Sequence, residues 1–258
     1  MNLHDITVAV EKFFQDHPLN TVKDLGNLRI FDVPLIAVAS AHDPLFERMR
    51  MDDAVGPLHK TPQEWLEGAR SVVSYFLPFT LQVREANRLN GLPANEWLYG
   101  RIEGEAMNVA LRQFLLQLFT DAGYAAVAPI LDNRFRVVDL KSNWSERHVA
   151  FIAGLGTFSL SRSMITKRGS AGRFGSVVVD MDIVPTARYY TEIDENCSKC
   201  GACIPRCPPN AIDESGKDNV ICWKYMEQMK ILYKPRYGCG KCQTAVPCEA
   251  VIPGKSFT

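Results

Sequence analysis

The stretch that decides the fold reads Cys197-Ser-Lys-Cys200-Gly-Ala-Cys203-Ile-Pro-Arg-Cys207-Pro208. It places four thiols within twelve residues and ends on a proline. This CxxCxxCxxxCP spacing is typical of [4Fe–4S] cluster ligation, and its fourth cysteine usually ligates the other cluster of a pair. The stretch therefore predicts an iron–sulfur site with a second cluster nearby.

The remaining cysteines all lie downstream, so the eight thiols of the chain divide into two groups of four. This number predicts two [4Fe–4S] clusters. By the crossing rule of two-cluster motifs, the fourth cysteine of the run joins the downstream thiols. The predicted first thiol set is Cys197, Cys200, Cys203 and Cys248, and the second thiol set is Cys207, Cys222, Cys239 and Cys242.

Zinc and disulfides are the alternative uses of such cysteines. Zinc knuckles also use CxxC pairs, but no histidine follows His148 to complete a mixed site. A disulfide framework needs an oxidising compartment, whereas the N-terminus, MNLHDITVAVEKFF, lacks the basic and apolar regions of a secretion signal. Reduced thiols and a cytoplasmic location are therefore expected.

Composition predicts one large domain and one small one. The chain has 258 residues, 47% of them apolar, and a formal net charge of zero, which argues against strong charge-driven binding of nucleic acid. No apolar run approaches the roughly 18 residues of a membrane helix. Because the cysteines crowd into the last quarter, we expect an α/β domain over residues 1–190 and a cluster domain over residues 191–258.

Periodicity predicts a mixed α+β arrangement. Helices are expected where apolar residues recur at helical spacing, and strands where short apolar runs lie between turn signals. The expected helices are Leu3–His17 and Arg101–Ala122, and the expected strands are Pro34–Ser40, Ser71–Phe79, Tyr124–Pro129, Arg134–Val138 and Val177–Val184.

A basic stretch overlaps a segment rich in glycine and small hydroxyls. From Leu131 to Arg173, eight Lys and Arg face three Asp and Glu, and Gly154 to Ser176 is unusually glycine-rich. The glycines fit neither a dinucleotide fingerprint nor a P-loop. An anionic ligand with a phosphate-bearing tail is one interpretation; ordinary turns and a solvated surface are the other.

Several motifs together resemble epoxyqueuosine reductase and its relatives, iron–sulfur corrinoid proteins related more distantly to reductive dehalogenases. The resemblance covers most of the chain and joins the cysteine motif to segments far upstream. These segments are Ala69–Pro78, Tyr99-Gly100-Arg101, Val138-Asp139, Glu146-Arg147, Ala153-Gly154-Leu155-Gly156 and Gly169-Ser170.

The resemblance implies a nitroreductase-like α/β domain that binds cobalamin, followed by a ferredoxin-like domain whose clusters pass electrons to the cobalt. FMN is the alternative cofactor. The resemblance also implies that Asp139 is the catalytic proton donor. The candidate cofactor-binding residues are Arg147, His148, Gly154, Leu155, Gly156, Gly169 and Ser170.

Two features depart from the family pattern. The family continues past its clusters into a helical-repeat region that helps to hold tRNA, so a chain that stops at Thr258 is expected to be a short form. The second family motif usually reads CxxCxxxCP, whereas here Val246 stands where cysteine is usual. We expect Cys248 to take over that role.

Three functions are compatible with these features. The first is a cobalamin-dependent reductase. The second is an electron carrier or reductive activator of a partner protein, because residues 217–241 hold six basic residues against two acidic ones and would attract an acidic ferredoxin or flavodoxin. The third, less favoured from the sequence, is reduction of epoxyqueuosine in tRNA by a short form.

Overall fold

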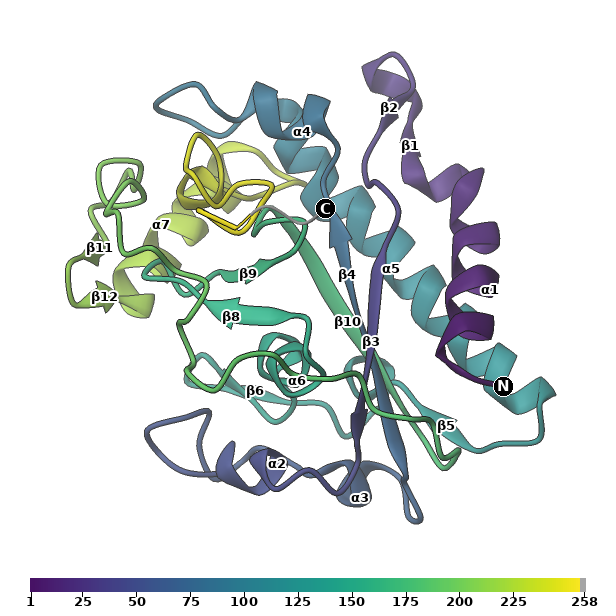
Figure 1. Cartoon of the computed structure of the whole chain (residues 1–258). Helices are drawn as coiled ribbons and strands as arrows, with labels where there is room; N and C mark the ends of the chain where they lie inside the picture. The colour runs from purple at the N-terminus through teal and green to yellow at the C-terminus, as the bar shows by residue number, and fades with distance from the viewer. Residues whose placement is uncertain (256–258) are drawn as a thin grey trace.

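The fold, a computed structural model that describes residues 1–255, centres on one antiparallel sheet. The strand order is β3–β4–β10–β5, and every neighbouring pair is antiparallel. Figure 1 shows these strands running through the middle of the molecule. The strands are β3 (Leu35–Ser40), β4 (Ser71–Pro78), β5 (Ala126–Val127) and β10 (Gly172–Val179).

Helices cover both faces of the sheet because its central strands are apolar on both sides. Val73 and Tyr75 of β4 pack in one hydrophobic cluster with α1 (Leu3–Gln15) and α5 (Asn95–Asp121). Val72 and Phe76 pack in another cluster with α2 (Leu45–Arg48) and α6 (Glu146–Ile152). Alternate residues of a strand point to opposite faces, so one fully buried strand serves two cores.

Shorter elements surround this centre. The strands are β1 (Thr21–Val22), β2 (Leu28–Arg29), β6 (Val137–Val138), β7 (Lys141–Ser142), β8 (Gly156–Phe158), β9 (Met164–Thr166), β11 (Ile212–Asp213) and β12 (Gly216–Lys217). The α-helices are α3 (Pro62–Trp65), α4 (Leu81–Ala86) and α7 (Asn219–Leu232), and the 3₁₀ turns are Pro18–Asn20, Lys23–Leu25, Pro129–Leu131 and Lys241–Gln243.

The mixed α/β class expected from the sequence is present, but several boundaries were wrong. The long helix begins at Asn95 rather than Arg101, and the last sheet strand spans Gly172–Val179 rather than 177–184. The stretch expected as a strand over 124–129 pairs only at Ala126–Val127. Gly100 lies inside the long helix, and Gly172 and Gly175 lie inside the last sheet strand, where they allow close packing.

The cysteine-bearing segment lies against α4 and the β8–β9 hairpin. Glu249, the residue after Cys248, is bound by Arg84 at 3.0 Å and Arg88 at 2.8 Å. The final loops, yellow in Figure 1, accordingly lie beside α4. Among residues 1–255, no helix has the length and apolarity needed to cross a membrane.

Candidate functional site

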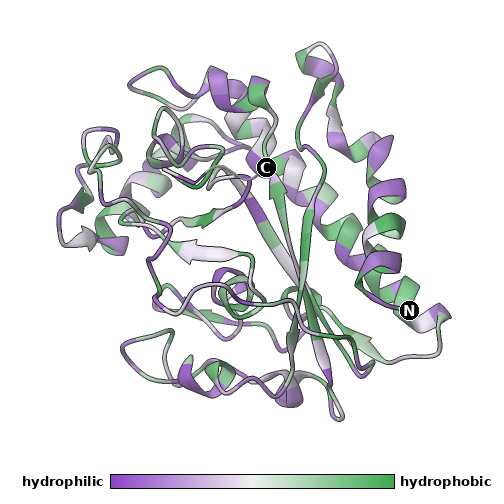
Figure 2. Ribbon diagram, viewed as in Figure 1, coloured by the Kyte–Doolittle hydropathy of each residue, from purple (hydrophilic) through white to green (hydrophobic). Residues whose placement is uncertain are grey.

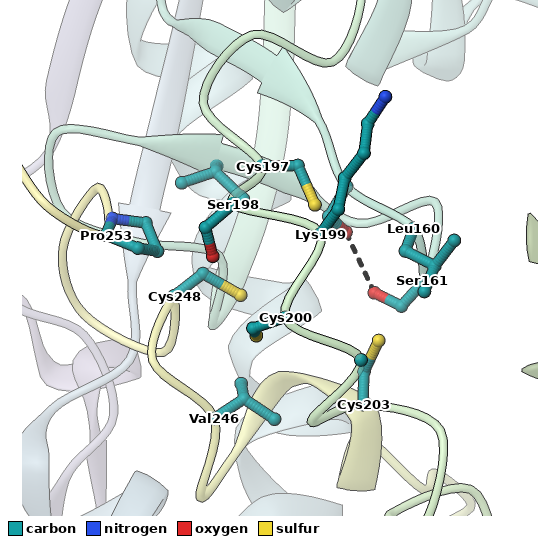
Figure 3. A pocket seen from close by; sticks show the side chains of 13 residues that line it. Leu160, Ser161, Cys197, Ser198, Lys199, Cys200, Cys203, Val246, Cys248 and Pro253 are labelled. Atoms are coloured by element: carbon teal, nitrogen blue, oxygen red, sulfur yellow. Dashed lines mark hydrogen bonds between the residues drawn. The ribbon is translucent and has the colours of Figure 1, made fainter. Parts of the chain in front are cut away.

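The first thiol set borders one cavity. Cys197, Cys200, Cys203 and Cys248 all line it, with the β8–β9 hairpin on one side and Val246 on another (Figure 3). The cavity is narrow, with a volume of about 20 Å³. The three cysteines of the CxxCxxC run thus face the same space as the distant Cys248.

The second thiol set borders a larger cavity. Cys207, Cys222, Cys239 and Cys242 line it, and its volume is about 380 Å³. Small-ligand pockets typically have about 300–1,000 Å³. Its remaining wall combines the central sheet and its helices with other parts of the cysteine-bearing segment: Phe79, Trp97, Arg101, Arg147, Ser163, Gly172, Arg173, Pro208, Pro209, Ile212, Lys217, Tyr225, Met226, Gly240 and Gln243.

Burial favours the neutral form of three of the thiols while they carry no metal. It raises the pKa of Cys203 and of Cys248 to about 11, and that of Cys239 to about 12. Metal binding must therefore displace protons from these sulfurs. Among residues 1–255, no three His, Cys, Asp or Glu side chains are grouped to hold a single metal ion. The thiols line the two cavities and do not converge on the position of a single metal ion.

Three arginines give the second cavity a positive wall. Arg101 comes from α5, Arg147 from α6 and Arg173 from β10. Arg101 stacks on the Tyr237 ring with its guanidinium carbon 4.6 Å from the centroid. The Nε atoms of Arg101 and Arg173 are buried and have no hydrogen-bond partner within residues 1–255. Arg147 donates to the carbonyl of Arg162 and lies within electrostatic reach of the second thiol set.

A buried charge network supports this wall from behind. Glu105 pairs with Arg173 through one oxygen and with Arg112 at 2.9 Å through the other. Arg112, which is 2% exposed, also reaches Glu146 at 3.3 Å. Burial raises the pKa of Glu146, against the opposing effect of Arg112. The network therefore fixes the direction in which Arg173 approaches the cavity.

Asp139 and His148 lie apart from both cavities. Asp139 is exposed in the turn of the β6–β7 hairpin, with a φ of +48°. His148 lies on α6, where its Nδ1 is 2.7 Å from the hydroxyl of Ser145. Burial lowers the pKa of His148 to about 3, so its imidazole is neutral near pH 7. The structure does not bring these two residues to the cysteines.

The glycine-rich candidates contact protein. Gly154 packs against the carbonyl of Ala187, Leu155 is buried in the core, and Gly156 pairs with Thr166 in the β8–β9 hairpin. A methyl group on Gly169 would lie 2.3 Å from the nitrogen of Ala250. Ser170 is buried, and its hydroxyl lies 3.9 Å from the sulfur of Cys248. These five residues line neither cavity, and of them Gly169 and Ser170 pack against the loop that follows Cys248.

Sequence reasoning missed Arg101, Trp97 and Phe79 as cavity residues. Trp97 and Arg101 are one helical turn apart on α5, but the expected helix began only at Arg101. An aromatic and a basic residue spaced for one helix face was the available signal. Nothing in the sequence connects Phe79, at the end of β4, to this site.

Comparison with known proteins places the chain among relatives of one group. No protein-family model matches it. The epoxyqueuosine reductase of Bacillus anthracis is 27% identical over 198 residues, which cover 72% of this chain and 50% of that protein. The chain therefore spans about half the length of this curated relative.

Solved structures share the fold at lower identity. An epoxyqueuosine reductase bound to a tRNA-Tyr epoxyqueuosine-modified stem loop matches with a TM-score of 0.54 and 18% identity, over 100% of this chain and 68% of that one. A reductive dehalogenase whose structure suggests a mechanism for B12-dependent dehalogenation matches with a TM-score of 0.51 and 16% identity, over 76% and 28%. Curated sequence relatives and structural neighbours thus agree with the resemblance seen in the motifs.

Proposed function

We propose that this relative of the epoxyqueuosine reductases is a reductase with two [4Fe–4S] clusters, one in each thiol-lined cavity. The observation that carries the proposal is the grouping of eight cysteines, four around each cavity. All eight are free thiols, the ligand type that iron–sulfur clusters require. In this arrangement residues 191–258 act as a ferredoxin-like electron conduit.

Cobalamin is the proposed electron acceptor, held against the positive wall of the second cavity by a nitroreductase-like domain over residues 1–190. Buried guanidinium groups with unpaired Nε donors fit a ligand that carries a phosphate, as cobalamin does. FMN carries a phosphate too, and the family resemblance favours cobalamin over it. When bound, cobalamin would supply reductive cobalt chemistry that amino-acid side chains lack.

Epoxyqueuosine in tRNA is the first substrate to test, because a structural neighbour was solved with that modified stem loop. This favours the third function above more than the sequence did. Asp139 is the proposed proton donor: its exposed carboxyl sits on a hairpin that also presents Lys141 to solvent. This turn lies apart from both cavities, so the proposal requires a substrate large enough to extend from the cofactor to the hairpin. Reductive opening of an epoxide needs a proton at the oxygen, which a carboxylic acid supplies.

The test begins with anaerobic purification and assays for iron, cobalamin binding and turnover. We expect about eight irons per chain, four for each thiol set. Titration with hydroxocobalamin should change its visible spectrum, and Arg101→Gln/Arg173→Gln should weaken that binding at least tenfold, since two charge-assisted contacts are lost. Arg70→Gln, an exposed arginine outside the cavity, is the matched control.

The outcomes separate the parts of the proposal. Zinc in place of iron would refute the clusters. Clusters without cobalamin or FMN binding would refute the cofactor assignment and leave an electron carrier for a partner protein. Cobalamin binding without conversion of an epoxyqueuosine-containing stem loop would refute the substrate, and an unchanged rate in Asp139→Asn would refute the proton donor.

A further inference from the structure

Helix α7 presents an unusual outer face. Along this helix, all of which is described, Met229 alone is buried. Val220, Trp223 and Ile231 are 51%, 46% and 84% exposed. At 3.6 residues per turn these three positions fall on one stripe of the helix. Exposed apolar groups gathered in this way indicate an interaction surface rather than ordinary solvent contact.

The opposite stripe of α7 faces the second cavity. Cys222, Tyr225 and Met226 line that cavity, and they lie on the same side of the helix as Met229. Figure 1 shows α7 at the edge of the molecule, far from α1, and Figure 2 shows polar and apolar turns along it. One helix therefore separates a proposed cluster ligand from an exposed apolar stripe.

Lysines flank the apolar stripe. Lys224 is exposed on the same stripe, and Lys234 follows the helix end. Neither forms an ion pair with any residue in 1–255, whereas Lys230 pairs with Glu227 at 2.9 Å. We call Val220, Trp223, Lys224, Ile231 and Lys234 the α7 outer surface. Glu227 also lies on this stripe, where Lys230 balances its charge, so Lys224 and Lys234 leave the surface net positive. That charge suits an acidic partner.

The cysteines are also exposed at a second surface, around Cys200, and this surface is negatively charged. Cys200, in the first thiol set, is exposed. Glu192, Asp194 and Glu195 lie just before it. Two cations oppose them, Lys199 at 3.0 Å from Asp194 and Lys255 at 4.0 Å from Glu195, so one negative charge remains in excess. An acidic protein would be repelled there. The charge of an acidic partner therefore favours the α7 outer surface over the surface around Cys200.

We infer that the α7 outer surface is the docking site of an acidic one-electron carrier protein that reduces the second thiol set's cluster. The inference rests on the proposed function, because it needs that cluster. The step moves one electron: the reduced carrier is oxidised, the cluster is reduced by one electron, and no bond forms or breaks. The apolar stripe excludes water at the contact while the lysines steer the encounter.

The experiment uses the anaerobic, cluster-loaded chain and a reduced plant-type ferredoxin as the probe. Cluster reduction is followed by stopped-flow absorbance at low and high salt. In Lys224→Glu/Lys234→Glu the second-order rate should fall at least tenfold, and its salt dependence should flatten, as expected when steering is lost. Lys12→Glu/Arg70→Glu makes the same change in net charge at exposed positions away from α7 and should keep the original rate.

Two further measurements separate failure of the clusters from failure of the docking site. Dithionite, a small reductant that needs no docking, should reduce the clusters of every variant equally. If a variant loses both its iron and the absorbance change with dithionite, that result would refute the clusters and not the docking site. Trp223→Ala should raise the ferredoxin concentration needed for half-maximal rate. Equal ferredoxin rates in both charge-reversed variants would overturn the inference. So would a dimer that dissociates on Trp223→Ala, or loss of tRNA stem-loop binding alone.

Discussion

Replacing Arg112 with methionine should destabilise the fold strongly and in a pH-dependent way. Arg112 is 2% exposed, and its guanidinium contacts Glu105, Glu146 and the carbonyl of Phe174, the last at 3.2 Å. Methionine fills much of the same volume, so little cavity forms. The main loss is the counter-charge of Glu146, whose side chain is only 13% exposed.

Removal of one partner from a buried ion pair typically costs about 3–5 kcal/mol. That is a large part of the about 5–15 kcal/mol by which domains are stable. Burial already raises the pKa of Glu146, and without Arg112 it rises further. A raised folded-state pKa makes the folded state hold its proton more tightly, so stability is retained at low pH and lost as pH rises through that pKa. The deficit should therefore be larger at pH 8 than at pH 5.

The assay is anaerobic urea unfolding followed by tryptophan fluorescence. Trp144 reports on this region, because its Nε1 donates to Ser176 at 2.9 Å and Ser176 in turn donates to Glu146. In Arg112→Met/Glu146→Gln the buried charge is absent, and we expect much of the stability to return and the pH dependence to shrink. A loss below about 1 kcal/mol at pH 8, or no recovery in the double variant, would refute the reasoning.

Four other substitutions test the cysteine region. Cys200→Ser and Cys222→Ser should each remove one cluster and leave about four irons; loss of all eight, or of none, would contradict separate sites. Gly240→Ala should abolish the second cluster, measured as iron content, because the backbone φ is +64° and the added methyl would lie 1.9 Å from a Trp97 ring atom. Glu249→Gln should cost about 2 kcal/mol. Burial raises the pKa of Glu249, but its arginine partners on α4 lower it overall, so the wild-type advantage is present near neutral pH and lost as pH falls through the folded-state pKa. Urea midpoints at pH 7 and pH 4 check this, and an advantage that grows on acidification would contradict it.

Local spacing predicts a shared space for the first cysteines because residues in a short loop are constrained by the chain itself; ligation of a cluster there stays a prediction. Residues 197–207 cannot spread far, so three of their thiols face one space whatever the rest of the fold does. The division of the downstream cysteines depended on a motif rule rather than on geometry. The structure places Cys248 beside the first three and the other downstream thiols beside Cys207, the same division.

The sequence did not reveal which glycines allow close packing, because that role depends on partners far away in the chain. Gly100 and Gly104 lie inside α5, where the rings of Phe79 and Phe31 pack directly against them. In β10, Gly175 leaves room for the hydroxyl of Tyr75, on the paired strand. A glycine needed for close packing looks the same in sequence as one that ends a helix or lines a ligand site.

The second cavity receives positive charge from arginines on three separate elements. A cluster ligated by four thiolates carries net negative charge, and reduction adds more, so a nearby cationic wall favours the electron's arrival. Within residues 1–255, Arg173 alone of the three arginines has a carboxylate partner, and that carboxylate, Glu105, is shared with Arg112. Arg101 and Arg147 are held instead by a ring and a carbonyl, so their charges stay uncompensated. The buried charge network thus contributes to the electrostatic potential at the cavity as well as to the stability of the fold. Arg112→Met should therefore alter both.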